Sequence, residues 1–88
     1  MNAKLHNKRV AILAADGFEQ SELEEPLVAL EEAGAMVCII SPKSGRIQGM
    51  HHAEKGDKFD VDLPLSQAKA AEFDALVIPG GLMNPDEL

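Results

Sequence analysis

The chain has 88 residues, of which 45% are hydrophobic and 26% are charged, and its formal net charge is −7 at pH 7. This length allows one small domain or part of a larger one, and the negative charge argues against nucleic acid and anionic membranes as partners. No apolar run approaches the roughly 20 residues of a membrane-spanning helix. The first ten residues lack the apolar segment of a signal peptide, and the single cysteine, Cys38, cannot form an internal disulfide. A single cysteine fits a protein of the reducing cytoplasm.

The chain begins with the pattern of a buried strand followed by an amphipathic helix. Residues 9–15 (RVAILAA) are apolar at consecutive positions, which predicts a strand that is buried on both faces. Leu23, Leu27 and Leu30 then recur at the spacing of one helical face, and glutamates occupy the other faces. We expect Gly34 to end this helix, because glycine readily adopts the left-handed conformation of a C′ residue.

The start of this helix carries two signals that conflict. Ser21 followed by Glu24 has the spacing of a capping box, in which two side chains satisfy free N–H groups of the first turn. Pro26 lies a few residues later, where a proline removes a hydrogen bond and crowds the preceding turn. Either the helix is kinked at Pro26 or its regular part begins near Pro26, and we favour a distorted first turn.

The middle of the chain combines a second buried strand with shorter polar elements. Residues 35–41 (AMVCIIS) predict the strand, and residues 42–45 (PKSG) predict a turn. Residues 46–50 (RIQGM) alternate weakly between apolar and polar, which indicates an edge strand. Residues 51–58 are polar and predict a loop, whereas residues 59–63 (FDVDL) alternate strictly and predict a short, half-exposed strand.

The last third of the chain predicts one short helix and one more buried strand. Residues 64–71 have the pattern of a helix that Ser66 could cap, and residues 74–81 (DALVIPGG) form an apolar strand closed by a Pro-Gly-Gly turn. Residues 84–88 (NPDEL) then show the cap signals of a new helix. A helix that starts at this point predicts that residues 1–88 are the N-terminal part of a longer domain.

Buried strands that alternate with helices are typical of an α/β fold with a parallel sheet and right-handed crossovers. Such a sheet is covered by helices on both faces, as in a three-layer α/β/α sandwich. In open sheets of this kind, functional sites form at the carboxyl ends of the strands. Two loops leave such ends, at residues 15–21 and 79–85, so we expect a site between these loops.

The two loops offer complementary chemistry. Glu19 lies on the first loop, and Gly80 and Gly81 lie on the second, where free N–H groups can stabilise an anion or a developing oxyanion. Together they predict an acid–anion site. Each feature also has a structural interpretation, since a Gly-Gly pair often only makes a turn and a glutamate at a helix start complements the helix dipole.

Other reactive side chains indicate structural roles. Cys38 lies mid-strand between apolar residues, where burial makes a thiol inert. His51 and His52 are adjacent, so their side chains diverge, and we expect a surface or subunit-contact loop rather than a metal site. Asp16 follows the first strand, as in phosphoacceptor receiver domains, but the third strand ends in IPGG and not in a second aspartate. No G-x-G-x-x-G follows the first strand, and we expect no cofactor.

Three blocks of the sequence together resemble a known family. They are RVAILAADGFEQSELEEPLVALEEAGAMVCIISPKSGRIQG, KGDKFDVDLPL and FDALVIPGGLMNPDEL, and they run from Arg9 to Leu88. The combination is similar to the PfpI family of intracellular proteases and amidases within the ThiJ/PfpI superfamily. This resemblance implies a flavodoxin-like, class I glutamine amidotransferase-like fold.

The resemblance also implies roles for the loop residues. Glu19 matches the family's acidic residue, which hydrogen-bonds the thiol of the nucleophile. Gly80 and Gly81 match glycines whose N–H groups contribute to the oxyanion hole. The nucleophile of the family is a cysteine followed by histidine on a strand-to-helix elbow, and this motif has no counterpart before Leu88. Partial desolvation favours the protonated form of a carboxyl group, which can then donate a hydrogen bond to a thiolate.

The leading functional interpretation is a cysteine-dependent hydrolase or lyase of the PfpI type. Its activities would be peptide or amide hydrolysis, or glyoxalase-like conversion of reactive aldehydes, with repair of glycated proteins as a related reaction. One alternative is a non-enzymatic stress protein of the same fold, acting as a redox sensor or chaperone. Another is a half-domain that works within an assembly. The resemblance implies a homodimer or homohexamer, and exposed strands at 46–50 and 59–63 would favour self-association.

Overall fold

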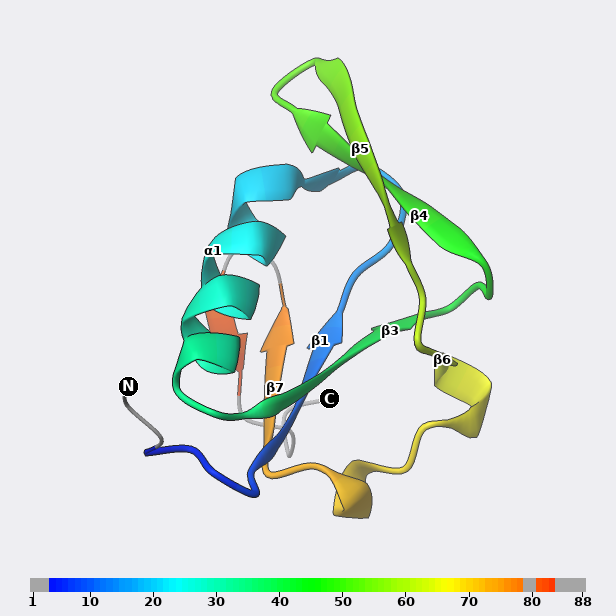
Figure 1. Ribbon diagram of the computed structural model, residues 1–88. Helices are drawn as coiled ribbons and strands as arrows, with labels where there is room; N and C mark the ends of the chain where they lie inside the picture. Colours follow the sequence, from blue (N-terminus) through cyan, green and yellow to red (C-terminus); the bar gives the residue numbers. More distant parts are fainter. Residues whose placement is uncertain (1–3, 79–80, 84–88) are drawn as a thin grey trace.

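The computed structural model describes residues 4–78 and 81–83. Figure 1 shows one α-helix beside strands that belong to two sheets. The elements in chain order are β1 (Arg9–Leu13), β2 (Phe18–Glu19), α1 (Gln20–Glu32), β3 (Met36–Ser41), β4 (Arg46–His51), β5 (Glu54–Asp60), β6 (Leu63–Pro64), β7 (Ala75–Ile78) and β8 (Gly81–Met83).

The larger sheet has the strand order β6-β3-β1-β7-β8. Its strand β1 pairs in parallel with β3 and β7, β6 extends the parallel pairing beyond β3, and β8 returns antiparallel to β7. Strands β1, β3 and β7 lie within the three apolar runs that predict buried strands. The parallel sheet with a crossover helix confirms the expected α/β fold.

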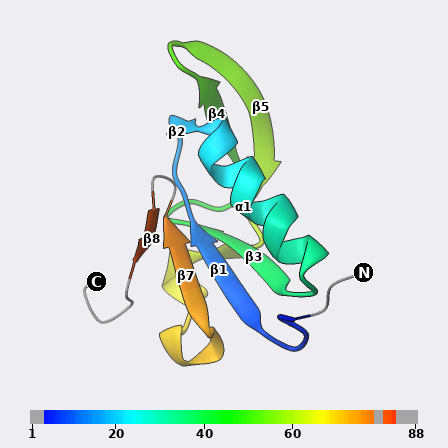
Figure 2. The same ribbon diagram turned by 90° about the vertical axis from the view of Figure 1, so that its left-hand side faces the viewer.

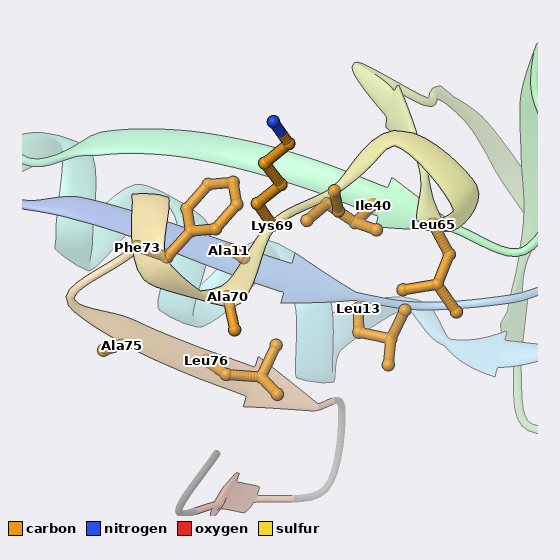
Figure 3. A pocket seen from close by; sticks show the side chains of 10 residues that line it. Ala11, Leu13, Ile40, Leu65, Lys69, Ala70, Phe73, Ala75 and Leu76 are labelled. Carbon is orange, nitrogen blue, oxygen red and sulfur yellow. The ribbon is translucent and has the colours of Figure 1, made fainter. Parts of the chain in front are cut away.

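The two faces of this sheet are covered differently. Helix α1 covers one face, where Ile12 and Ile39 pack with Leu23 in a buried cluster. Figures 1 and 2 show the helix on one side of the strands and the segment between β6 and β7 on the other. That second side holds an apolar cavity of about 310 Å³, shown in Figure 3, with Leu13, Leu65 and Leu76 in its wall.

Helix α1 ends as the sequence predicts. Gly34 has a φ of +93°, and its N–H donates to the Glu31 carbonyl oxygen at 3.0 Å. The next N–H, of Ala35, donates to the Leu30 carbonyl oxygen at 3.0 Å. This pair of bonds is a Schellman motif, which satisfies two carbonyl groups that the helix leaves free.

The start of α1 differs from the expectation. The residue at the N-cap is Glu19, and no side chain caps the helix, so the predicted capping box of Ser21 and Glu24 does not form. The helix runs without interruption from Gln20 through Pro26, so its regular part does not begin at the proline. Glu24 instead accepts a hydrogen bond from the Gln20 side chain, one helical turn earlier.

The smaller sheet, ordered β2-β4-β5, corrects three expectations. The segment 46–50 is not an edge strand, because β4 lies between β2 and β5. The predicted loop at 51–58 is mostly strand β5, which forms a hairpin with β4. The predicted strand at 59–63 is divided between the two sheets, because β5 ends at Asp60 and β6 begins at Leu63. Between them, Asp62 exchanges hydrogen bonds with the backbone of Ile39 in β3.

The segment that follows β6 also differs from the expectation. Two 3₁₀ turns, Leu65–Gln67 and Ala70–Glu72, replace the helix predicted at 64–71, and Ser66 caps neither of them. The helix start predicted at 84–88 lies outside the described residues. Within residues 4–78 and 81–83, no helix is long and apolar enough to cross a membrane.

Candidate functional site

A crevice of about 350 Å³ opens at the carboxyl ends of β1 and β7. This is the edge of the sheet at which the loop following β1 was expected to form a site. The walls are mostly apolar, and the two charged residues among the described lining residues are both glutamates. The lining residues are Leu13, Ala14, Ala15, Phe18, Glu19, Glu22, Pro42, Leu65 and Ile78.

The loop between β1 and α1 is held in place by the strand β4. Asp16 Oδ1 accepts a hydrogen bond from the Gln48 N–H at 2.8 Å, and the Gly17 N–H donates to the Gln48 carbonyl oxygen at 2.8 Å. Asp16 Oδ2 also pairs with Lys43 Nζ at 2.8 Å. These contacts, led by the Lys43 hydrogen bond, lower the pKa of Asp16 below its ordinary value. Asp16 is therefore engaged in fixing the loop.

Phe18 forms a rigid part of the crevice wall. Its side chain is buried, and its ring meets the Phe59 ring edge-on, with 5.5 Å between the centroids. This geometry is a favourable arrangement for two aromatic rings. Phe18 also pairs through its backbone with Gly49 of β4. The residue next to Glu19 is thus fixed by both packing and strand pairing.

Glu19 is half-buried and lies at the junction of β2 and α1. Its two carboxylate oxygens lie 3.1 and 3.3 Å from the backbone nitrogen of His52, whose N–H donates to them. His52 has a φ of +57° in the turn between β4 and β5. The residue predicted to serve the site therefore lines the crevice, and its carboxylate also binds the tip of the hairpin.

Glu22 is a second carboxylate of the crevice, and the sequence did not single it out. It lies in the first turn of α1, three residues after Glu19, so both side chains share one side of the helix start. Glu22 is exposed and has no side-chain hydrogen bond or ion pair within the described part of the chain. The i, i+3 spacing of the two glutamates was the signal that could have identified it.

The glycine pair is only partly covered by the structure. Gly80 lies outside the described residues. Gly81 begins β8 and pairs with Ile78 of β7, whereas the sequence predicted that Gly81 belongs to a turn. The oxyanion-hole role of Gly80 and Gly81 remains a prediction.

The remaining reactive side chains lie apart from this crevice's lining. Cys38 in β3 pairs with Ala11 and is half-buried. Its burial is the main cause that raises the pKa of its thiol, and the nearby negative charge of Asp62 raises this pKa further. A raised pKa agrees with the inert role expected for it. His51 ends β4 and His52 lies in the hairpin turn. Among the residues described, no group of three or more His, Cys, Asp or Glu side chains could hold a metal ion.

The sequence has relatives along nearly its whole length. A model of the DJ-1/PfpI family matches residues 8–88. A Bacillus subtilis protein named "Putative cysteine protease YraA" is 41% identical over 83 residues, which cover 93% of this chain and 46% of that protein. "Deglycase TK1284" of Thermococcus kodakarensis is 45% identical over 73 residues, covering 83% of this chain and 42% of the relative. The chain thus spans less than half the length of these two relatives.

Solved structures show the same arrangement of elements. The DJ-1 superfamily protein Atu0886 from Agrobacterium tumefaciens matches with a TM-score of 0.72 and 28% identity, over 84% of this chain and 38% of that chain. A two-domain protein from Anabaena variabilis, with DJ-1/ThiJ/PfpI-like and ferritin-like domains, matches with a TM-score of 0.74 and 34% identity. That match covers 92% of this chain and 22% of the Anabaena chain.

Proposed function

The chain belongs to the DJ-1/PfpI family, and from this premise we propose that it contributes to a cysteine-dependent hydrolase or lyase. Its substrates would be peptides, amides or small reactive aldehydes, including the carbonyl groups of glycated proteins. The names of two relatives, a cysteine protease and a deglycase, support this range of carbonyl chemistry. The observation that carries the proposal is the apolar crevice with two carboxylates at the carboxyl ends of the strands.

The proposed role of the carboxylates is to sustain a reactive thiolate. A carboxyl group that holds a proton can donate a hydrogen bond to the thiolate, which stabilises the ionised sulfur for attack on a carbonyl carbon. The nucleophile would lie in a part of the protein beyond Leu88. Cys38 does not fit this role, because it lies mid-strand and burial raises the pKa of its thiol.

Both glutamates are candidates for the hydrogen bond to the thiol. Glu19 is the residue that the family resemblance implies, and it lines the crevice. Its oxygens are already engaged by the His52 N–H, whereas the Glu22 carboxylate has no such partner in the described residues. This difference favours Glu22 as the group that contacts the thiol, with Glu19 beside it holding the wall.

The proposal is tested by labelling and turnover in the full-length protein. We expect one thiol to react with iodoacetamide at neutral pH, and turnover of methylglyoxal or a peptide amide to fall in proportion to the label. The matched control is Cys38→Ser, which should retain both the labelled site and the activity. Loss of the labelled site in this variant would assign the reactive thiol to Cys38 and contradict the proposal. A fully labelled protein with unchanged turnover would exclude thiol catalysis.

A non-enzymatic stress protein of the same fold is the second proposal, because the same reactive thiol could act as a redox sensor. The two functions differ in the fate of the carbonyl substrate. A sensor would oxidise readily with peroxide yet leave methylglyoxal and peptide amides unchanged. Substrate consumption with repeated turnover would remove the sensor-only interpretation.

We also propose that residues 1–88 form the N-terminal part of a single cytoplasmic domain. The support is that the chain spans less than half of its curated relatives. An isolated 88-residue piece should then lack a cooperative thermal transition, since small domains bury too little surface to be robust. A sharp melting transition of this piece would argue against the proposal.

Self-association as a homodimer or homohexamer is a further proposal. One strand expected to favour self-association, at 46–50, is not exposed as an edge, because β4 lies between β2 and β5. The outer strand β5 carries charged side chains, which disfavour pairing with another chain. Support remains in the exposed apolar side chains of Val28 and Met36. Light scattering of the full-length protein at micromolar concentration should give at least a dimer, and a monomer would refute this.

A further inference from the structure

Gln20 is a buried polar residue that lies in the sequence between the two glutamates of the crevice. Only 3% of its surface is exposed. Its Nε2 donates to Glu24 Oε1 at 2.9 Å and to Asp57 Oδ2 at 2.9 Å, and its Oε1 accepts from the Asp57 N–H at 2.7 Å. Both amide hydrogens and the amide oxygen are therefore used, which is the full donor capacity of a glutamine.

The two glycines that face Gln20 leave little room for a larger side chain at their positions. A Cβ at Gly56 would overlap Gln20 Oε1, and it would lie 3.0 and 3.1 Å from two atoms of the His51 ring. A Cβ at Gly49 would lie 3.3 Å from the Gln20 Cβ. Two glycines of the hairpin thus allow its backbone to approach the first turn of α1, and the Gln20 side chain fills the space between them.

The hydrogen bonds of Gln20 fix the hairpin in a way that its apolar contacts do not. Ile47 and Phe59 pack the hairpin against the core, and such packing is non-directional. The hydrogen bonds of the Gln20 amide instead fix where Asp57 of β5 lies relative to helix α1, because hydrogen bonds are sensitive to distance and angle. The same hairpin carries the His52 N–H that binds Glu19.

We propose that Gln20 is a positioning residue for the crevice, setting the orientation of Glu19 and Glu22 relative to the reactive thiol. It precedes Glu22 by two residues in the first turn and follows Glu19 directly. Its bonds to Asp57 tie that turn to the hairpin, whose tip in turn holds the Glu19 carboxylate. This inference rests on the function proposed above, because it assigns the amide a role in tuning the thiol.

The test uses Gln20→Met in the full-length protein, which keeps the side-chain volume and removes the hydrogen bonds. Asp57→Ala removes the carboxylate that accepts from Gln20 Nε2 but keeps the backbone N–H that donates to Gln20 Oε1. Because Asp57 is exposed, this variant is the one least prone to misfolding. The readout is the pH midpoint of iodoacetamide alkylation. We expect Gln20→Met to raise the midpoint by about half to one pH unit, which is roughly threefold to tenfold slower alkylation below it. Asp57→Ala should move the midpoint in the same direction by less.

A matched control separates positioning from general loss of stability. Gln67→Met makes the same exchange at an exposed residue of the 3₁₀ turn and should leave the midpoint unchanged. Adding Asp57→Ala to Gln20→Met should produce no further change, because both variants break one network. Circular dichroism at the assay temperature establishes that each variant is folded.

Two results would overturn the inference. Unchanged midpoints in Gln20→Met and Asp57→Ala, with altered midpoints in variants of Glu19 or Glu22, would remove the role of Gln20 and leave the proposed function intact. Wild-type midpoints in the variants of all four residues would remove both the inference and the proposed role of the carboxylates.

Discussion

The two sheets of this protein share one apolar core but differ in their polar contacts. In the larger sheet, β1 lies between β3 and β7, and Ile12 and Ile39 pack in a cluster without polar partners. The smaller sheet is joined to the loop and helix start by the polar side chains of Asp16 and Gln20, which bind the Gln48 backbone N–H and Asp57 respectively. Phe18 and Ile47 of the smaller sheet join the same apolar cluster, and the polar contacts add the directional bonds that shape the crevice.

The largest effect is expected from a cavity in the larger sheet. Ile12→Ala should lower the free energy of unfolding of the full-length protein by about 2–5 kcal/mol, because Ile12 is completely buried. Urea unfolding measures the change. The control is Val28→Ala on the exposed face of α1, which should cost no more than about 0.5 kcal/mol. Equal effects of the two substitutions would show that burial in the apolar core is not the main source of stability.

An intermediate effect is expected where the smaller sheet meets the helix. A Cβ at Gly49 would lie 3.1 Å from Phe18 Cζ and 3.2 Å from the Asp57 carbonyl oxygen. Gly49→Ala should therefore cost about 1–3 kcal/mol through overpacking. Hydrogen exchange should show the loss first in the amides of β4 and β5, with those of β1 less affected. Uniform loss of protection in both sheets would contradict the separation between them.

The smallest effect is expected at Asp16, and it depends on pH. Contacts with Lys43 and Gln48 lower its pKa below the ordinary value of 3.8, so its contribution to stability is present above that value. The contribution is lost as pH falls through the lower pKa of the folded state. Asp16→Asn should lower the urea midpoint slightly at pH 7, and this difference should shrink below about pH 4. A difference that persists unchanged at pH 2 would exclude the charge as its cause.

The sequence was sufficient to predict β1, β3 and β7 of the larger sheet, because their information is local, but it did not predict β6 or β8. Consecutive apolar residues at 9–15 and 35–41 indicate buried strands wherever they occur, and Gly34 ends the helix through its own backbone conformation. The same reasoning led to Glu19, since a loop at the carboxyl end of a strand can be recognised from order alone.

The smaller sheet could not be predicted in this way. Gln20 and Asp57 are separated by 37 residues, and Asp16 and Gln48 by 32, so nothing in a short window indicates their pairing. Residues 54–58 of β5 are mostly charged, so their sequence has the pattern of a loop. They form a strand through hydrogen bonds to β4 rather than through apolar burial. The hydrogen bond from the His52 N–H to Glu19 also joins residues that are distant in the sequence, so it could not be predicted. Without it, nothing favoured Glu22 over Glu19 as the residue that contacts the thiol.

Activation of the thiol by the two crevice carboxylates is tested most directly by the alkylation rate as a function of pH. The rate is measured in the full-length protein and in Glu19→Gln, Glu19→Ala, Glu22→Gln and Glu22→Ala. We expect the pH midpoint to rise in the alanine variants, by an amount that is larger at Glu22 and smaller in the glutamine variants, because an amide still donates a hydrogen bond. A midpoint that rises by one pH unit corresponds to about 1.4 kcal/mol of lost thiolate stabilisation. Curves for all four variants that superimpose on the wild-type curve would contradict the claim that these carboxylates activate the thiol.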